Sequence, residues 1–167
     1  MRDIPILSHV RRNHALEHAT IHLLSERCRG LRIVGRSTPG GFTLYGDVST
    51  EAVETAAQDA LQQMRAGRRE LAVHPTCGTN LVVGGALAAL GAFAVLTPRR
   101  RNLGEWLGRL PLVILFATAG LILGQPLGAL VQARVTTDAH VDNLYIVRVV
   151  RQQRGALVVH HVRTGQL

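Results

Sequence analysis

The stretch LVVGGALAALGAFAVL, residues 81–96, contains no charged side chain. At a rise of 1.5 Å per residue it would form a helix about 24 Å long, and the polar uncharged residues beside it extend this toward the hydrocarbon thickness of about 30 Å. A second apolar run, residues 110–131, is interrupted only by Gln125 and Pro126. A chain of 167 residues has too little other material to cover two such helices. We therefore predict a transmembrane helical hairpin over residues 79–135.

Small residues recur four positions apart on both apolar runs, which is typical of closely packed membrane helices. This spacing predicts the lipid bilayer as the main partner. It also predicts association with another membrane protein, or with a second copy of the chain, through one glycine row. The small residues are Gly84, Ala88 and Ala92 on the first run, and Gly120, Gly124 and Gly128 on the second.

The two ends of the chain are expected to fold together as one α+β head, because two membrane passes return them to the same side. Residues 1–78 predict two helices, at 10–29 and 50–66, and a β-hairpin of strands 31–36 and 42–48, followed by a short extended run at 70–73. Residues 136–167 predict a second hairpin, of strands 145–150 and 156–162, which would complete a four-stranded sheet. The predicted fold is thus a small soluble head of two helices and two β-hairpins joined to a two-helix transmembrane hairpin.

The composition narrows the choice of partner. All 19 basic residues are arginine, and the net charge is +8. Six aromatic residues, none in a basic and aromatic alternation, do not form a stacking surface for bases, so no nucleic acid is expected. Arginines near membrane segments are expected to meet lipid head groups instead.

The predicted location is a bacterial inner or thylakoid-type membrane. The three arginines at 99–101, in the loop between the two apolar runs, are nearly equalled in number by the arginines that flank the other ends of these runs. The positive-inside rule therefore gives no clear orientation in the membrane. Because no export signal is found before the N-terminal part, the head is expected on the cytoplasmic side. Cys28 and Cys77 are too few to make a disulfide framework.

His14, Glu17 and His18 form an H-x-x-E-H motif on the first predicted helix. Residues three and four apart share a helical face, which suits a divalent metal ion held by two imidazoles with a carboxylate beside them. This is the spelling of the inverted zinc-peptidase motif. The motif predicts a zinc site in which Glu17 is the general base for a metal-bound water.

A catalytic zinc site needs three protein ligands, so one more side chain is required. His74 and Cys77, just before the first apolar run, and His140, just after the second, are all candidates. His22 lies two turns from His14, about 12 Å along the axis, which is too far for one ion to join all three histidines of the helix. A thiolate from Cys77 would favour zinc or iron over magnesium.

Three blocks of the sequence resemble an uncharacterised bacterial family of small two-pass membrane proteins. The blocks are NHALEHATIHLL (residues 13–24), GGFTLYGDV (residues 40–48) and LAVHPTCGTN (residues 71–80). The resemblance implies a membrane location and no particular activity. A looser similarity to membrane-bound zinc peptidases rests on His14, Glu17 and His18, without an acidic third ligand.

Two classes of function follow from these patterns. The first is a zinc-dependent hydrolase, in the form of a peptidase, that acts at the membrane surface. The second is a non-catalytic accessory or assembly subunit of a larger membrane complex, in which the histidines are structural or hold a pigment or haem.

Overall fold

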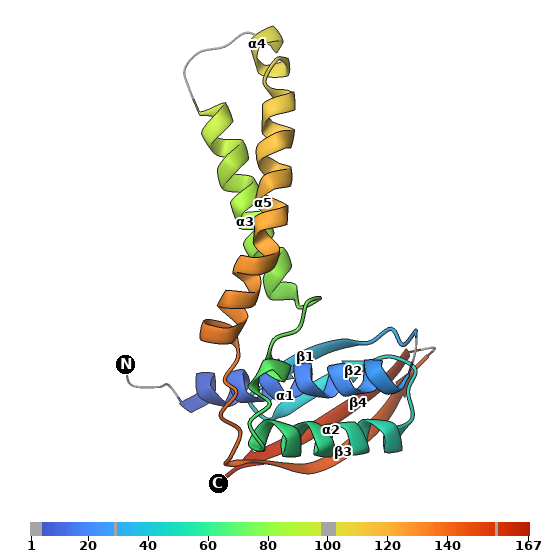
Figure 1. Ribbon diagram of the computed structural model, residues 1–167. Helices are drawn as coiled ribbons and strands as arrows, with labels where there is room; N and C mark the ends of the chain where they lie inside the picture. Colours follow the sequence, from blue (N-terminus) through green and yellow to red (C-terminus); the bar gives the residue numbers. More distant parts are fainter. Residues whose placement is uncertain (1–4, 29, 98–102, 156) are drawn as a thin grey trace. The chain divides into compact units, whose positions relative to one another are not determined.

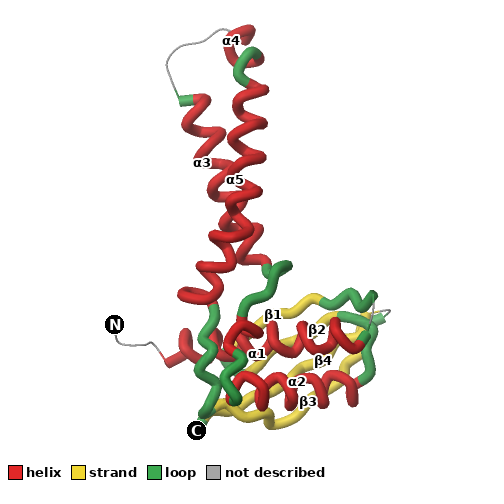
Figure 2. Tube along the Cα trace, viewed as in Figure 1, coloured by secondary structure: helices red, strands yellow, loops and turns green. Residues whose placement is uncertain are grey.

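The computed structural model describes residues 5–28, 30–97, 103–155 and 157–167. The chain divides into two compact units, one made of residues 1–74 and 132–167 and the other of residues 75–131. The loop arginines at 99–101 lie outside the described residues. Figures 1 and 2 show the order of the elements along the chain.

The first unit is an α+β fold, and the predicted fold class is confirmed. Helices α1 and α2 lie on one face of a four-stranded antiparallel sheet (Figures 1 and 2). Its elements are α1 (Pro5–Arg27), β1 (Val34–Thr38), β2 (Gly41–Tyr45), α2 (Thr50–Arg65), η1 (Arg69–Ala72), η2 (Gln132–Thr136), β3 (Leu144–Arg154) and β4 (Leu157–Gln166).

The sheet has the order β1-β2-β4-β3, so its central pairing joins the two ends of the chain. Phe42 lies opposite Val162, and Leu44 lies opposite His160. All four side chains are at most 2% exposed. Because side chains alternate along a strand, this register turns one face of β2 and β4 toward the helices and leaves the other face open.

Both helices of this unit are amphipathic and contribute their apolar faces to one core. Ser49 caps α2, since its side chain accepts a hydrogen bond from the Ala52 amide at 3.1 Å. The buried apolar residues of the helices are Ala15, Leu16, Ala19, Ile21, Leu23 and Leu24 of α1, and Val53, Ala56, Ala57, Ala60, Leu61 and Met64 of α2.

The segment predicted to be extended at 70–73 is instead mostly a turn of 3-10 helix, η1. The Val73 amide donates to the Glu70 carbonyl at 3.2 Å, and the Arg68 guanidinium pairs with the Glu70 carboxylate at 3.0 Å. This turn lies against α1, and two backbone carbonyls from this stretch of chain receive hydrogen bonds from histidines of α1.

The second unit is a helical hairpin of α3 (Gly78–Leu96) and α5 (Leu110–Val131), with a short helix α4 (Leu103–Leu107) before α5. The polar residue and the proline that interrupt the apolar run, Gln125 and Pro126, do not interrupt the helix, because α5 continues through Pro126. Proline lacks an amide hydrogen, so α5 loses one backbone hydrogen bond there without ending.

Two helices are long and apolar enough to cross a membrane, at Gly78–Leu96 and Gly104–Thr136, each with a mean hydropathy of 1.9. In the most apolar stretch of each helix, only 17% and 11% of the residues, respectively, are buried. Large apolar side chains such as Val82, Phe93 and Ile122 are at least 66% exposed. Core helices of soluble proteins are mostly covered, whereas lipid-facing helices expose such residues to the acyl chains.

Glycines bring α3 and α5 into backbone contact. A Cβ added at Gly120 would meet the backbone of Ala88, one at Gly124 would meet the backbone of Gly84, and one at Gly128 would meet Asn80. All three α5 glycines are buried. The glycine row is therefore used within the chain, and its association with another chain remains a prediction.

Candidate metal centre

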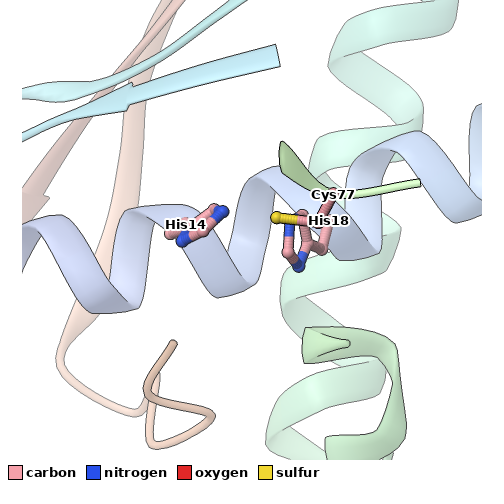
Figure 3. A group of neighbouring side chains, drawn as sticks. All are labelled: His14, His18 and Cys77. Carbon is pink, nitrogen blue, oxygen red and sulfur yellow. The ribbon is translucent and has the colours of Figure 1, made fainter. Parts of the chain in front are cut away.

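Helix α1 presents three histidines on consecutive turns of one face. His18 is 2% exposed, and His14 and His22 are half-buried. The ring centroids of His14 and His18 are 4.3 Å apart, and their nearest ligand nitrogens lie within 4.8 Å of each other. Figure 3 draws these two rings on α1, together with the thiol of Cys77. The four-residue spacing of the motif thus brings two imidazoles together, as the sequence predicts.

Backbone carbonyls fix the orientation of each ring. His14 donates from Nδ1 to the Thr136 carbonyl at 3.0 Å, and His18 donates from Nδ1 to the Ala72 carbonyl at 2.7 Å. A neutral imidazole that donates from Nδ1 carries its lone pair on Nε2. This is the arrangement found in most metal-binding histidines, in which the second ring nitrogen is held by an oxygen acceptor.

His74 extends the cluster along α1. Its ring centroid lies 4.5 Å from that of His22 and 5.7 Å from that of His18. Its backbone is clamped by the fully buried Gln132, which accepts from the His74 amide at 2.9 Å and donates to the His74 carbonyl at 3.1 Å. His22 donates from Nε2 to the Val73 carbonyl at 2.9 Å.

The cluster favours neutral imidazoles. Burial, followed by the nearby His22 and His18, lowers the pKa of His74 to about 4. A neutral ring can offer its lone pair to a metal ion, whereas a protonated ring cannot. His74 is therefore in the ligand-competent state at neutral pH.

Glu17 is buried at 4% exposure and faces the edge strand β1. Its carboxylate accepts a hydrogen bond from the Ser37 hydroxyl. An added Cβ at Gly35, on the same strand, would overlap the Glu17 side chain. The motif glutamate thus has a packing role against β1, and its role as general base stays a prediction.

Gly35→Ala is expected to destabilise the head by about 1–3 kcal/mol, since the new methyl group must displace a buried, hydrogen-bonded carboxylate. Gly40→Ala is the matched control, because a Cβ at Gly40 meets no described atom within 4 Å. Urea unfolding of both variants checks this. Equal unfolding midpoints would mean that Glu17 moves aside without cost.

The other two predicted ligands, His140 and Cys77, belong to different units of the chain. His140 is 65% exposed in its side chain and pairs with Asp138 at 2.9 Å, and no metal-compatible group among the described residues includes it. Cys77 belongs to the second unit, where it precedes α3 and its thiol contacts the Thr79 hydroxyl at 3.5 Å. The structure therefore brings together His14 and His18 from α1, with His74 and His22 beside them.

Most of the groups that orient these rings could not be predicted from the sequence. Three of them are backbone carbonyls, of Ala72, Val73 and Thr136, and any residue type supplies a carbonyl. Gln132 carried one weak signal, as an amide side chain at the end of a long apolar run. An uncharged polar group at such a position needs a partner when buried.

A separate histidine is buried in the sheet. His160 is fully buried, its Nε2 lies 3.3 Å from the Thr50 hydroxyl, and its Nδ1 has no hydrogen-bond partner among the described residues. Burial, then Arg151 and His161, lower the pKa of His160, against an opposing effect of Glu51.

The stability of the head is expected to fall as the pH drops from about 7.5 to about 5. An unfolded histidine has its usual pKa near 6.5, so below that value the unfolded state binds more protons than the folded state, in which the pKa of His160 is lowered. His160→Leu should reduce this dependence and leave the part that comes from His74, whose pKa is also lowered. Unfolding curves at the two pH values check it, and an unchanged slope in the variant would assign the pH dependence to other groups.

The fold and the site define a small α+β protein that carries a cluster of buried and half-buried histidines and two helices apolar enough to cross a membrane. Residues 9–149 match the family model described as "Domain of unknown function (DUF6391)", and the chain belongs to this family.

An uncharacterized protein of Picosynechococcus sp. is 37% identical over 101 residues, which cover 54% of this chain and 49% of the relative. The chain thus spans about half the length of this curated relative. No solved structure matches this chain. The predicted resemblance to an uncharacterised bacterial family is confirmed, and these matches give no support to the similarity with zinc peptidases.

Proposed function

We propose that this chain is a membrane-bound protein that holds one transition-metal ion, zinc, through His14 and His18. The observation that carries the proposal is the pair of oriented imidazoles, each tied at Nδ1 to a backbone carbonyl. A histidine pair kept only for packing gains little from two tautomers that are fixed in this way. Imidazole ligands suit zinc, copper, iron and nickel, and they do not suit magnesium or calcium.

The geometry requires only a small adjustment for a tetrahedral ion. Zinc–nitrogen bonds of about 2.0–2.1 Å separate two ligand nitrogens by about 3.3 Å. The two ligand nitrogens already lie within 4.8 Å of each other. Small shifts of the two side chains that keep both Nδ1 hydrogen bonds would close the difference.

Cys77 is the third ligand in this proposal. It follows His74 by three residues, so the chain keeps the two Cα atoms within about 11 Å of each other. Cys77 also stands at the N-terminal end of α3, where a helix favours negative charge and hence a thiolate. A site of two histidines and one cysteine leaves a fourth position for water.

Cobalt substitution of the full chain in detergent tests this ligand set. We expect one Co²⁺ per chain, visible absorption typical of tetrahedral coordination, and a thiolate-to-cobalt charge-transfer band. Cys77→Ser should remove the charge-transfer band, and Cys28→Ser, at the other free cysteine, should keep it. A band that persists in Cys77→Ser, or a tetrahedral site without the band in the wild type, would exclude Cys77. Failure to bind cobalt would overturn the metal site itself.

The reaction that such a centre would support is hydrolysis at the membrane surface, with Glu17 as base for the metal-bound water. Only the H-x-x-E-H spacing supports this finer proposal. Glu17→Gln is expected to keep the metal ion and to abolish cleavage of peptide substrates. Metal content and proteolysis of an unfolded substrate protein, measured on the same sample, check it. Cleavage that survives in Glu17→Gln would remove Glu17 from the mechanism.

The rival proposal is a non-catalytic subunit of a larger membrane complex. The exposed apolar side chains of α3 and α5 favour it, because they fit a neighbouring membrane helix as well as they fit lipid. Purification in a mild detergent separates the two proposals. A stoichiometric complex without metal supports the subunit, whereas a metal-loaded single chain supports the metal-binding protein.

A further inference from the structure

The face of the sheet turned away from the helices carries a second feature. Phe42 and Val162 are buried with the core, so the neighbouring positions Thr43, His161 and Arg163 lie on the opposite face. Arg148 pairs with Arg163 across β3 and β4 and shares that face. Figure 2 shows both helices of this unit on the other side of the strands.

This open face is hollowed. A cavity of about 560 Å³ is lined by residues of β1, β2, β3, β4 and the turn between β1 and β2. We refer to it as the arginine groove. Its charged and polar lining residues are Thr38, Thr43, Arg148, His161 and Arg163.

Two like charges oppose each other directly in the arginine groove. Arg148 and Arg163 are partners in the β3–β4 register, and both are exposed. Like charges in this position destabilise a sheet unless an anion neutralises them. Within the described part of the chain, neither arginine takes part in an ion pair. The four strands contain no aspartate or glutamate at all.

A row of hydrogen bonds makes the floor of the groove polar. The Thr43 hydroxyl lies 3.0 Å from His161 Nδ1, and His161 Nε2 lies 3.4 Å from the Gln152 amide oxygen. In this row Nε2 donates to the amide oxygen, so Nδ1 accepts from the threonine. The imidazole is therefore held across three strands beside the two guanidinium groups.

We propose that the arginine groove binds the phosphate of an anionic phospholipid head group. Two guanidinium groups offer the paired donors that phosphate oxygens accept, and the net charge of +8 attracts anionic lipid. A lipid is favoured over a nucleic acid because Phe42, the only phenylalanine, tyrosine or tryptophan that lines the groove, is 2% exposed and so cannot stack on a base. The chain also carries two helices apolar enough to keep it at a membrane.

The test is a lipid titration of the full chain in an uncharged detergent, followed by native mass spectrometry. The probes are short-chain phosphatidylglycerol, the same lipid with a phosphatidylcholine head, inorganic phosphate and a short RNA. We expect the wild type to bind phosphatidylglycerol at least about tenfold more tightly than phosphatidylcholine. Arg148→Gln/Arg163→Gln should reduce this preference to less than about twofold.

Matched variants separate a local site from the overall charge. Arg32→Gln/Arg69→Gln removes the same charge from two exposed arginines outside the groove and should keep the preference. Arg148→Lys/Arg163→Lys retains the charge without the paired donors, so it should lose most of the preference while it stays folded.

Three results would overturn the proposal. These are a preference that survives in the glutamine variant, a preference that falls equally in the control, and inorganic phosphate or RNA that binds more tightly than phosphatidylglycerol. The metal content of every variant should be unchanged, which separates this proposal from that of the metal site.

Discussion

Gly124→Leu is expected to separate α3 from α5 and to lower the thermal unfolding midpoint by roughly 5–10 °C. A Cβ at this position would meet the backbone of Gly84, and backbone atoms cannot rotate away as a side chain can. Overpacking typically costs about 1–3 kcal/mol, and contact between two backbones places this variant at the upper end of that range. Thermal unfolding in detergent, followed by circular dichroism, measures the shift.

Gly85→Leu is the matched control, because Gly85 lies next to Gly84 on α3 and a Cβ there meets no described atom within 4 Å. It should unfold within about 2 °C of the wild type. Equal shifts in the two variants would show that the effect comes from added bulk in an apolar helix, and that the α3–α5 contact does not depend on Gly124.

His14→Ala/His18→Ala is expected to weaken zinc binding by at least about 100-fold. Loss of an orienting partner alone typically costs about 10–100-fold in metal affinity, and this variant removes two ligands. Competition with a chromophoric chelator measures the dissociation constant. Circular dichroism should show the same helix content, since alanine is the strongest helix former.

His9→Ala is the control for this double variant. His9 is also a half-buried histidine of α1, but it lies outside the face that carries His14, His18 and His22. Its zinc affinity should equal that of the wild type. A similar loss in both variants would assign zinc binding to scattered surface histidines.

Much of the fold follows from local patterns in the sequence. The apolar spacing of Leu16, Ala19 and Leu23 predicts α1, and Ser49 marks the start of α2. The turn residues Pro39 and Gly40 predict the first hairpin. Two apolar runs predict α3 and α5, because segments of that length and composition have few alternatives.

Features that depend on distant partners could not be predicted in this way. Pro126 is a helix breaker by local rules, yet α5 continues through it. The turn η1 forms where the sequence predicts an extended run, and it packs against α1, which lies far from it along the chain. Local propensity differs by less than the free energy of such packing, so tertiary contacts decide the outcome.

The candidate site also has one part that the sequence predicts and one part that it does not. The pairing of His14 with His18 is a property of one helix, and the sequence predicts it. The approach of His74 to His22 joins residues about fifty positions apart, so no local spacing encodes it. His140 is exposed and pairs with Asp138, and the sequence alone does not place it outside the histidine cluster of α1.

Elemental analysis of the full chain, purified in detergent with a histidine-free tag and incubated with zinc before removal of the excess, tests the central proposal most directly. The account predicts about one zinc ion per chain, bound through His14 and His18. Protein that is folded by circular dichroism and holds no stoichiometric transition metal would contradict it.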